Sequence, residues 1–228
     1  MSYDTQLHIN SRASTSQPYG TSQRAILNRV AFATAQGEIT SWPGYAPTPL
    51  IPLPGLAGEA VVADVWCKHE GSRFGLGSFK PTGPTFAMLA VLKAEVKARA
   101  GVEASTQDLL DGKYAQVTAN VVVSAPTSGN HGRALAWGAT MFGCQAVLYM
   151  NDGVSAGRAV AIEAHGGQVV RVPGAYEQVV TRLYEDAERH GHIVVGDPGT
   201  EQYPHVSRDI MQGYALVVDE LMAALDPE

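Results

Sequence analysis

The chain has 228 residues, 45% hydrophobic and 17% charged, which is typical of a globular protein with a sizeable core. Its formal net charge of −6 argues against nucleic-acid binding, and no apolar stretch is long enough to cross a bilayer. The first twenty residues are polar and unlike a signal peptide, and Cys67 and Cys144 are isolated, so we expect a cytoplasmic protein with reduced thiols.

The N-terminal part of the chain has weak patterning. Residues 1 to about 40 begin with a Ser-, Thr- and Gln-rich stretch, so we expect a partly flexible segment. Residues 43–54 are rich in proline and are expected to be extended. The β-branched run 61–68 predicts a strand. A helix is predicted to begin at Pro84, because proline is favoured at the first helical position, and to end at Gly101.

From residue 116 onward, strand and helix patterns alternate. Strands are predicted at 116–124, 145–150, 168–172 and 192–195, and helices between them at 130–142, 155–166 and 176–187. A last helix is predicted from Ser207 to about Leu225. The alternation indicates an α/β fold with a parallel sheet and right-handed crossovers. His190 and His192 pair across a glycine, but no further ligands lie near them, so we expect no metal site.

The run RFGLGSFK at residues 73–80 ends in a lysine whose surroundings are shaped. Lys80 stands between Phe79 and Pro81 in a turn with two glycines just before it. A partly desolvated lysine loses its proton more easily and forms an imine with a carbonyl. Because most lysines are solvated surface groups, the run, and not the residue type, makes Lys80 the candidate nucleophile.

The run SAPTSGNHG at residues 124–132 joins a predicted strand to a predicted helix. Backbone N–H groups at such a helix start bind carboxylate or phosphate. An imine-forming lysine and an anion cradle together suggest pyridoxal-phosphate chemistry on an amino acid. The alternative is an ordinary strand-to-helix turn, in which Gly129 permits the bend and Ser128 or Asn130 caps the helix.

Two further runs accompany these, WPGYAPTPL at 42–50 and IMQGY at 210–214. In order and spacing, the four runs resemble the N-terminal portion of diaminopropionate ammonia-lyase, over roughly residues 40–220. That family has the tryptophan-synthase-β-like fold (fold type II of the pyridoxal-phosphate enzymes), which implies a three-layer parallel sheet with flanking helices. The Ser-Gly-Asn-His loop marks the broad fold group, whereas WPGYAPTPL and IMQGY are more specific to the ammonia-lyases.

The resemblance implies a reaction and the residues that carry it. The reaction is the elimination of ammonia from diaminopropionate to give pyruvate, with pyridoxal phosphate as the electron sink. Lys80 would hold the cofactor as an imine and then move the Cα proton, and Phe79 would lie beside the cofactor ring. Asn130 would hydrogen-bond the phenolic oxygen of the ring. The expected substrate-binding residues are those of the loop: Thr127, Ser128, Gly129 and His131.

Three further residues have expected roles in the site, and for two of them an alternative interpretation stays open. His131 and Tyr214 are expected to line the site, although His131 equally fits a helix-start side chain with a satisfied hydrogen bond. Asp197 matches the family's second acidic residue, which would assist proton transfer on the L-isomer. The alternative for Asp197 is an aspartate in a turn, which is common.

One position departs from the family pattern. The ammonia-lyases carry Asp where this chain has Ser128, and the family uses that Asp for the D-isomer. A carboxylate can remove a proton near neutral pH, whereas a serine hydroxyl without a base cannot. We therefore expect a preference for L-substrates or for a different β-substituted amino acid.

Family members also continue past the matching stretch and supply a Gly-rich loop for the cofactor phosphate. This sequence has no such loop, since Gly166-Gly167 is interpreted as a helix terminus. We expect a fragment, one part of a split protein or a shortened relative, with its second domain incomplete. The expected division is residues 1–81 as a segment of the large cofactor domain, 82–200 as a small parallel α/β domain, and 201–228 as a helix leading into the missing part.

The expected partners are a small amino-acid substrate and either a second copy in a homodimer or a complementing C-terminal part. Two alternative functions stay open. One is another reaction on the same scaffold, such as serine or threonine dehydration or β-replacement, which Ser128 favours. The other is a non-catalytic assembly module, which the missing phosphate loop favours.

Overall fold

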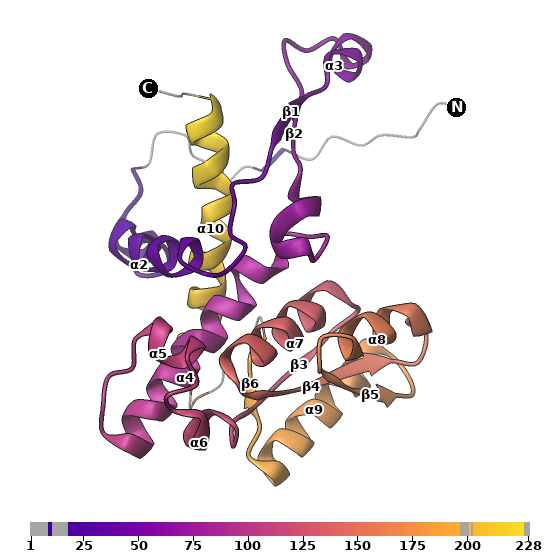
Figure 1. Cartoon of the computed structure of the whole chain (residues 1–228). Helices are drawn as coiled ribbons and strands as arrows, with labels where there is room; N and C mark the ends of the chain where they lie inside the picture. Colours follow the sequence, from indigo (N-terminus) through magenta and orange to yellow (C-terminus); the bar gives the residue numbers. More distant parts are fainter. Residues whose placement is uncertain (1–8, 11–17, 197–200, 202, 226–228) are drawn as a thin grey trace.

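The structure is a computed structural model that describes residues 9–10, 18–196, 201 and 203–225 (Figure 1). Its centre is a four-stranded parallel sheet in the order β5-β4-β3-β6. The strands are β3 (Val122–Pro126), β4 (Gln145–Asn151), β5 (Gln168–Val172) and β6 (Ile193–Val194). The central strand β3 is paired on both sides, since Ser124 lies beside Val147 of β4 and Val194 of β6.

Helices cover both faces of this sheet. The connecting helices are α7 (Asn130–Phe142), α8 (Ala156–Glu163) and α9 (Tyr176–His190), and Figure 1 shows α9 on one face with α7 and α8 on the other. Side chains of a strand point alternately to its two faces. Along β4, Leu148 therefore packs in one core with α7 and α8, while Val147 and Tyr149 pack in a second core with α9. The predicted three-layer α/β fold is confirmed.

Three further helices pack beside the sheet layers. They are α2 (Arg29–Thr40), α4 (Pro84–Ala100) and α10 (Val206–Leu225), and α10 lies against both of the others. Helix α4 begins at Pro84 and is closed by Gly101 at φ +71°, as predicted. Gly213 lets α10 lie close to the backbone of Thr82, because a Cβ at position 213 would collide with the Thr82 carbonyl oxygen.

Part of the segment between α2 and α4 forms an arm that projects from the rest of the molecule (Figure 1). Its strands β1 (Leu50–Pro52) and β2 (Trp66–Lys68) pair antiparallel, and α3 (Pro54–Ala60) is part of the connection between them along the chain. Two 3-10 turns follow, η1 (Glu70–Gly75) and η2 (Lys80–Thr82). The remaining short helices are α1 (Thr21–Arg24), α5 (Thr106–Leu110) and α6 (Ala115–Thr118).

The predicted strand 116–124 is wrong in its first half. Residues 115–118 form α6, with Thr118 N–H bonded to the carbonyl of Tyr114. The neighbouring strand β4 begins at Gln145, which lies opposite Val122, so the residues before Val122 have no partner strand. They satisfy their backbone groups locally as a helical turn instead.

Two N-terminal expectations also need correction. The strand predicted at 61–68 begins only at Trp66. Val61, which follows the end of α3, lies in the left-handed region (φ +54°), and β1 offers only three residues for pairing. Residues 29–40, expected within a flexible segment, form α2, whose first turn is capped by the Asn28 side chain accepting from Ala31 N–H. Gly166-Gly167 follows the end of α8, with Gly167 N–H bonded to the Ile162 carbonyl, so the helix-terminus interpretation is confirmed.

Among the described residues, no helix is both long and apolar enough to cross a membrane.

Candidate active site

Lys80 begins η2, directly before α4, and its amine lies beside two aromatic rings. The Nζ atom donates a hydrogen bond of 3.0 Å to Tyr214 Oη. It lies 5.0 Å from the ring centroid of Phe79 and 4.9 Å from that of Tyr214. These two rings meet edge to face at 4.9 Å. The aromatic environment therefore fixes the direction in which the Lys80 amine points.

Two glycines let Tyr214 of α10 reach this position. A Cβ at Gly83 would lie 2.7 Å from Tyr214 Cδ1, closer than real side chains approach one another. Gly213, next to the tyrosine, lets α10 settle on the Thr82 carbonyl. Glycine at both positions is what allows η2 and α10 to meet, and the Lys80–Tyr214 hydrogen bond depends on that contact.

The loop between β3 and α7 is shaped from inside by Thr127. This threonine is buried, and its Oγ1 accepts hydrogen bonds from the backbone N–H of Gly129 (3.0 Å) and of Gly132 (2.9 Å). Gly129 adopts φ +147°, a backbone conformation that residues with a Cβ rarely take. The expected substrate-binding Thr127 and Gly129 are thus also the residues that give the loop its shape.

The other loop side chains have distinct surroundings. Ser128 is exposed, and its carbonyl accepts a hydrogen bond of 2.8 Å from Arg158 Nη1. Asn130 is exposed and does not cap α7; its Oδ1 accepts a long hydrogen bond of 3.4 Å from Arg133. His131 Nε2 donates to the Val195 carbonyl at 2.9 Å, so this ring is anchored at the end of β6.

These parts meet in a pocket of about 280 Å³ at the carboxyl edge of the sheet. Its lining residues are Lys80, Pro126, Thr127, Ser128, Asn130, His131, Arg158, Tyr176 and Gly196. The pocket thus brings the candidate lysine together with the candidate anion-binding loop. Phe79 and Tyr214 flank the Lys80 amine without lining the pocket, and Asp197 lies outside the described residues.

Two lining side chains, those of Arg158 and Tyr176, lie outside every run that the sequence analysis singled out. Arg158 lies in the first turn of α8, and Tyr176 is the first residue of α9. A general rule was available to find them, since ligands of open α/β sheets bind outside the carboxyl ends of the parallel strands. The helices that follow β4 and β5 both start at that edge.

The described lining combines an amine, backbone N–H groups at the start of α7, and the guanidinium of Arg158. An amine of this kind can attack a carbonyl and carry a proton. N–H groups at a helix start and an arginine both bind carboxylate or phosphate. The arrangement suits a carbonyl-bearing cofactor and an amino-acid substrate in one pocket.

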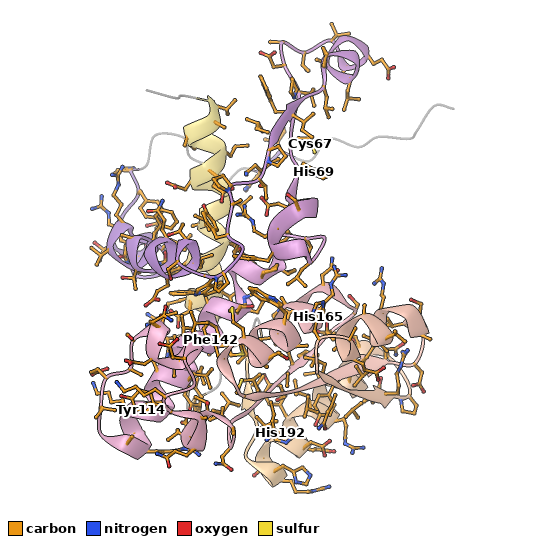
Figure 2. The ribbon with its side chains drawn as sticks, viewed as in Figure 1. Cys67, His69, Tyr114, Phe142, His165 and His192 are labelled. Carbon is orange, nitrogen blue, oxygen red and sulfur yellow. The ribbon has the colours of Figure 1, made fainter. Side chains whose placement is uncertain are left out.

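Histidine and cysteine side chains are spread over the molecule. Figure 2 shows Cys67 and His69 on the arm, at a distance from His192 near α9. The rings of His190 and His192 lie 5.6 Å apart, and burial, followed by the charge of His190, lowers the pKa of His192. Within the part of the chain that the structure describes, no three His, Cys, Asp or Glu residues form a group able to hold a metal ion.

Comparison with known proteins gives concordant matches. A family model described as "Pyridoxal-phosphate dependent enzyme" matches residues 41–228. The diaminopropionate ammonia-lyase of Escherichia coli (strain K12) is 36% identical over 177 residues, which cover 78% of this chain and 43% of that protein. The chain therefore spans less than half the length of this curated relative.

Solved structures agree with this match. The crystal structure of diaminopropionate ammonia lyase from Escherichia coli in complex with D-serine superposes with a TM-score of 0.79 at 30% identity, over 89% of this chain and 50% of that chain. Maize serine racemase superposes with a TM-score of 0.62 at 20% identity, over 87% of this chain and 50% of that chain. The second likeness concerns the fold alone.

Proposed function

The chain belongs to the family of pyridoxal-phosphate dependent enzymes, and on this premise we propose that it is a lyase that eliminates ammonia from diaminopropionate. In the complete reaction, diaminopropionate and water give pyruvate and two molecules of ammonia. One observation carries the proposal: the Lys80 amine and the anion-binding loop around Ser128 line the same pocket. The relatives named diaminopropionate ammonia-lyase support the choice of substrate.

The described residues fit the reactive part of pyridoxal phosphate. Lys80 would hold the cofactor through its amine, and Phe79 would lie beside the ring. Asn130 accepts a hydrogen bond through Oδ1, which leaves its Nδ2 to donate to the phenolic oxygen of the ring. Bound there, the cofactor would supply an electron sink for negative charge at the substrate Cα.

Each of the candidate site residues has a separate role in this proposal. Lys80 Nζ would take the proton from the substrate Cα as a general base. The hydrogen bond to Tyr214 Oη orients the amine for that transfer. Backbone N–H groups of the loop bind the substrate carboxylate, and Thr127 keeps the loop in the shape that exposes them. Asp197, outside the described residues, would protonate the departing amine.

A second reaction on the same scaffold is favoured by the charges of the pocket. The described lining residues carry two cationic side chains, Lys80 and Arg158, and no carboxylate. A substrate with a neutral β-hydroxyl meets less repulsion there than one with a second ammonium group. Dehydration of serine or threonine, or β-replacement, is therefore the alternative. The exposed hydroxyl of Ser128, where the ammonia-lyases carry Asp, supports the same alternative and a preference for L-substrates.

Domain division, compartment and assembly are proposals as well. The division into residues 1–81, 82–200 and 201–228 is supported by the position of the sheet and its connecting helices between Val122 and Val194. A cytoplasmic location is supported by two free cysteines, Cys67 and Cys144. A homodimer, or a complementing C-terminal part, would complete the assembly.

The test combines spectroscopy with substrate profiling. The purified chain is mixed with pyridoxal phosphate, and a visible absorbance band that borohydride removes is expected. Ammonia and pyruvate are then measured with D- and L-diaminopropionate, and keto acid with serine and threonine. Product from diaminopropionate supports the lyase, whereas product from the hydroxy amino acids alone supports dehydration. No band and no product would favour the non-catalytic module.

A further inference from the structure

Arg73 is the most completely enclosed charged side chain among the described residues, at 1% exposed. Its guanidinium forms forked pairs with two carboxylates. Nε and Nη2 each donate to Glu70 at 2.9 Å. Nη1 and Nη2 each donate to Glu220 of α10 at 2.7 Å. Bidentate pairs of this kind fix geometry as well as charge.

A second cation completes the group. Lys68 Nζ donates to Glu220 Oε2 and to the Thr48 carbonyl, both at 2.6 Å. Lys68, Glu70, Arg73 and Glu220 form what we term the buried ion cluster, in which two positive charges balance two negative ones.

The run WPGYAPTPL also contributes to this cluster. The Tyr45 hydroxyl donates to Glu220 Oε1 at 2.9 Å, and the Thr48 N–H donates to Glu220 Oε2 at 3.1 Å. The proposed function assigned no role to this run. Two of its polar groups, the Tyr45 hydroxyl and the Thr48 N–H, bind the carboxylate of Glu220.

The cluster is connected to Lys80 along two routes. Along the chain, Arg73 begins the run that ends at Lys80, and this run is held along its length. Phe74, at φ +50°, packs on Trp137 with ring centroids 4.9 Å apart, and the Leu76 carbonyl accepts from Arg133. These contacts therefore couple the position of Arg73 to that of Lys80.

The other route runs along α10. Glu220 lies about 9 Å beyond Tyr214 on this helix, at 1.5 Å per residue. Arg73 and Glu220 are thus joined to each other. Arg73 lies seven residues before Lys80 in the chain, and Glu220 lies on the same helix as Tyr214. The hydrophobic attraction that packs α10 has no preferred direction, whereas the forked hydrogen bonds between Arg73 and Glu220 do.

We infer that the buried ion cluster positions Lys80: by clamping η1 to α10 it sets the hydrogen bond between Lys80 and Tyr214. Arg73 and Glu220 are positioning residues in this arrangement, since neither contacts the pocket. The inference rests on the proposed function of Lys80 as the residue that holds the cofactor. The competing explanation is that the cluster stabilises the fold and has no effect on the lysine.

Three variants and a matched control separate these explanations. Arg73→Lys keeps the charge and removes the planar fork, Glu220→Gln removes one charge at nearly constant shape, and Tyr45→Phe removes one hydrogen bond and no charge. The control is Tyr149→Phe, which removes a similar hydrogen bond of 3.0 Å to Asp186 in the core beneath α9.

The measurement is the rate at which pyridoxal phosphate and borohydride tag Lys80, read by peptide mapping and divided by the rate for the exposed Lys113. Thermal stability is recorded for each variant. The ratio is expected to fall about tenfold in Arg73→Lys and Glu220→Gln, since small misplacements of a reacting group have effects of this size or more. It is expected to fall less in Tyr45→Phe, and to stay at the wild-type value in Tyr149→Phe.

The outcomes are distinguishable. If wild-type Lys80 is not tagged, the proposed function itself is contradicted. If wild-type Lys80 is tagged and the three variants tag it equally well, the cluster is only structural and this inference is overturned. The same holds if Tyr149→Phe lowers the ratio as much as Tyr45→Phe does. Should Glu220→Gln fail to fold, Tyr45→Phe still decides, because it leaves all four charges in place.

Discussion

Lys80 Nζ and Tyr214 Oη lie 3.0 Å apart although 134 residues separate them in the sequence. The bond joins the segment before α4 to α10, the last helix described. The aromatic ring of Tyr214 also packs against Phe79, the neighbour of the lysine. The position of the candidate nucleophile is thus set by a helix that takes no direct part in lining the pocket.

Replacement of Lys80 by alanine is expected to abolish cofactor attachment, because it removes the amine that we propose holds pyridoxal phosphate. Turnover should fall by at least about 10²-fold, the usual effect of losing a proton-transfer group. The measurement is borohydride reduction followed by peptide mapping, with Lys113→Arg as the control. A tag found on Lys93 or Lys113 in the wild-type chain would show that another lysine holds the cofactor.

Asn130→Ala is expected to alter the cofactor without releasing it, since the side chain offers one neutral hydrogen bond. The visible absorbance band should shift and turnover should fall, while the tag on Lys80 remains. Asn130→Asp serves as a comparison, because it keeps the size and changes the donor. An unchanged spectrum together with an unchanged rate would mean that Asn130 only occupies the first position of α7.

Ser128 is expected to make the enzyme stereoselective, because the described lining residues offer no carboxylate that could act on the D face. L-diaminopropionate should react faster than the D-isomer by about 10²–10⁴-fold, and Ser128→Asp should recover part of the D-activity. Ser128→Asn introduces a side chain of the same size as aspartate without its charge, and it should not recover the D-activity. Equal wild-type rates on both isomers would show that another group serves the D face.

Thr127→Val is expected to loosen the loop, since the hydroxyl that accepts from Gly129 and Gly132 is lost while the volume is kept. A buried N–H group without an acceptor costs about 1–3 kcal/mol. The free energy of unfolding in urea should therefore fall by about 2 kcal/mol, and Thr127→Ser, which keeps the hydroxyl, should restore most of it. If valine leaves both stability and substrate binding unchanged, the loop keeps its shape by other means.

Glu220 is expected to make stability depend on acid pH. Burial by itself raises the pKa of this carboxyl, but hydrogen bonds from Arg73 and Lys68 outweigh burial and hold it at about 2, below its ordinary 4.5. A depressed folded-state pKa stabilises the protein fully above the unfolded value, and the contribution is lost as pH falls through the folded value. The free energy of unfolding should therefore drop between about pH 4.5 and pH 2.

The contribution of Glu220 to that drop is at most about 3.5 kcal/mol, from 1.4 kcal/mol for each unit between pKa 4.5 and about 2. Glu220→Gln should be less stable than wild type at pH 7 and should lose less stability across this window. Glu103→Gln is the control, because Glu103 is an exposed carboxylate that pairs with the equally exposed Lys97. Identical pH profiles for wild type and Glu220→Gln would contradict the assignment.

Most of the sheet domain could be predicted because its elements are specified locally. Each strand contains a short apolar run, and α4 begins at Pro84 and ends before Gly101, both of which are local signals. The failure at 115–118 has a different origin. Val117 and Thr118 are β-branched and favour a strand by themselves. They form a helical turn because β4 begins only at Gln145, opposite Val122, and so offers them no partner.

The candidate site could be predicted where its residues lie within recognisable sequence runs. Lys80 and the Thr127–His131 loop could be proposed from their neighbours, and they do line one pocket. The buried ion cluster could not be foreseen, because Arg73 and Glu220 are separated by 147 residues and nothing beside Glu220 distinguishes it from a surface glutamate. Arg158 and Tyr176 could have been found from their places at the carboxyl edge of the sheet.

The position of α10 has a consequence for synthesis on the ribosome. The pairing partners of β3, β4, β5 and β6 all lie between Val122 and Val194, so this sheet can form before α10 has been synthesised. The contacts of α10 reach back to Gln36, 183 residues earlier, and to Arg73, and such long closures form late. Translation can therefore produce the sheet and the loop between β3 and α7 first, and Lys80 acquires Tyr214 as its hydrogen-bond partner only after α10 has been synthesised.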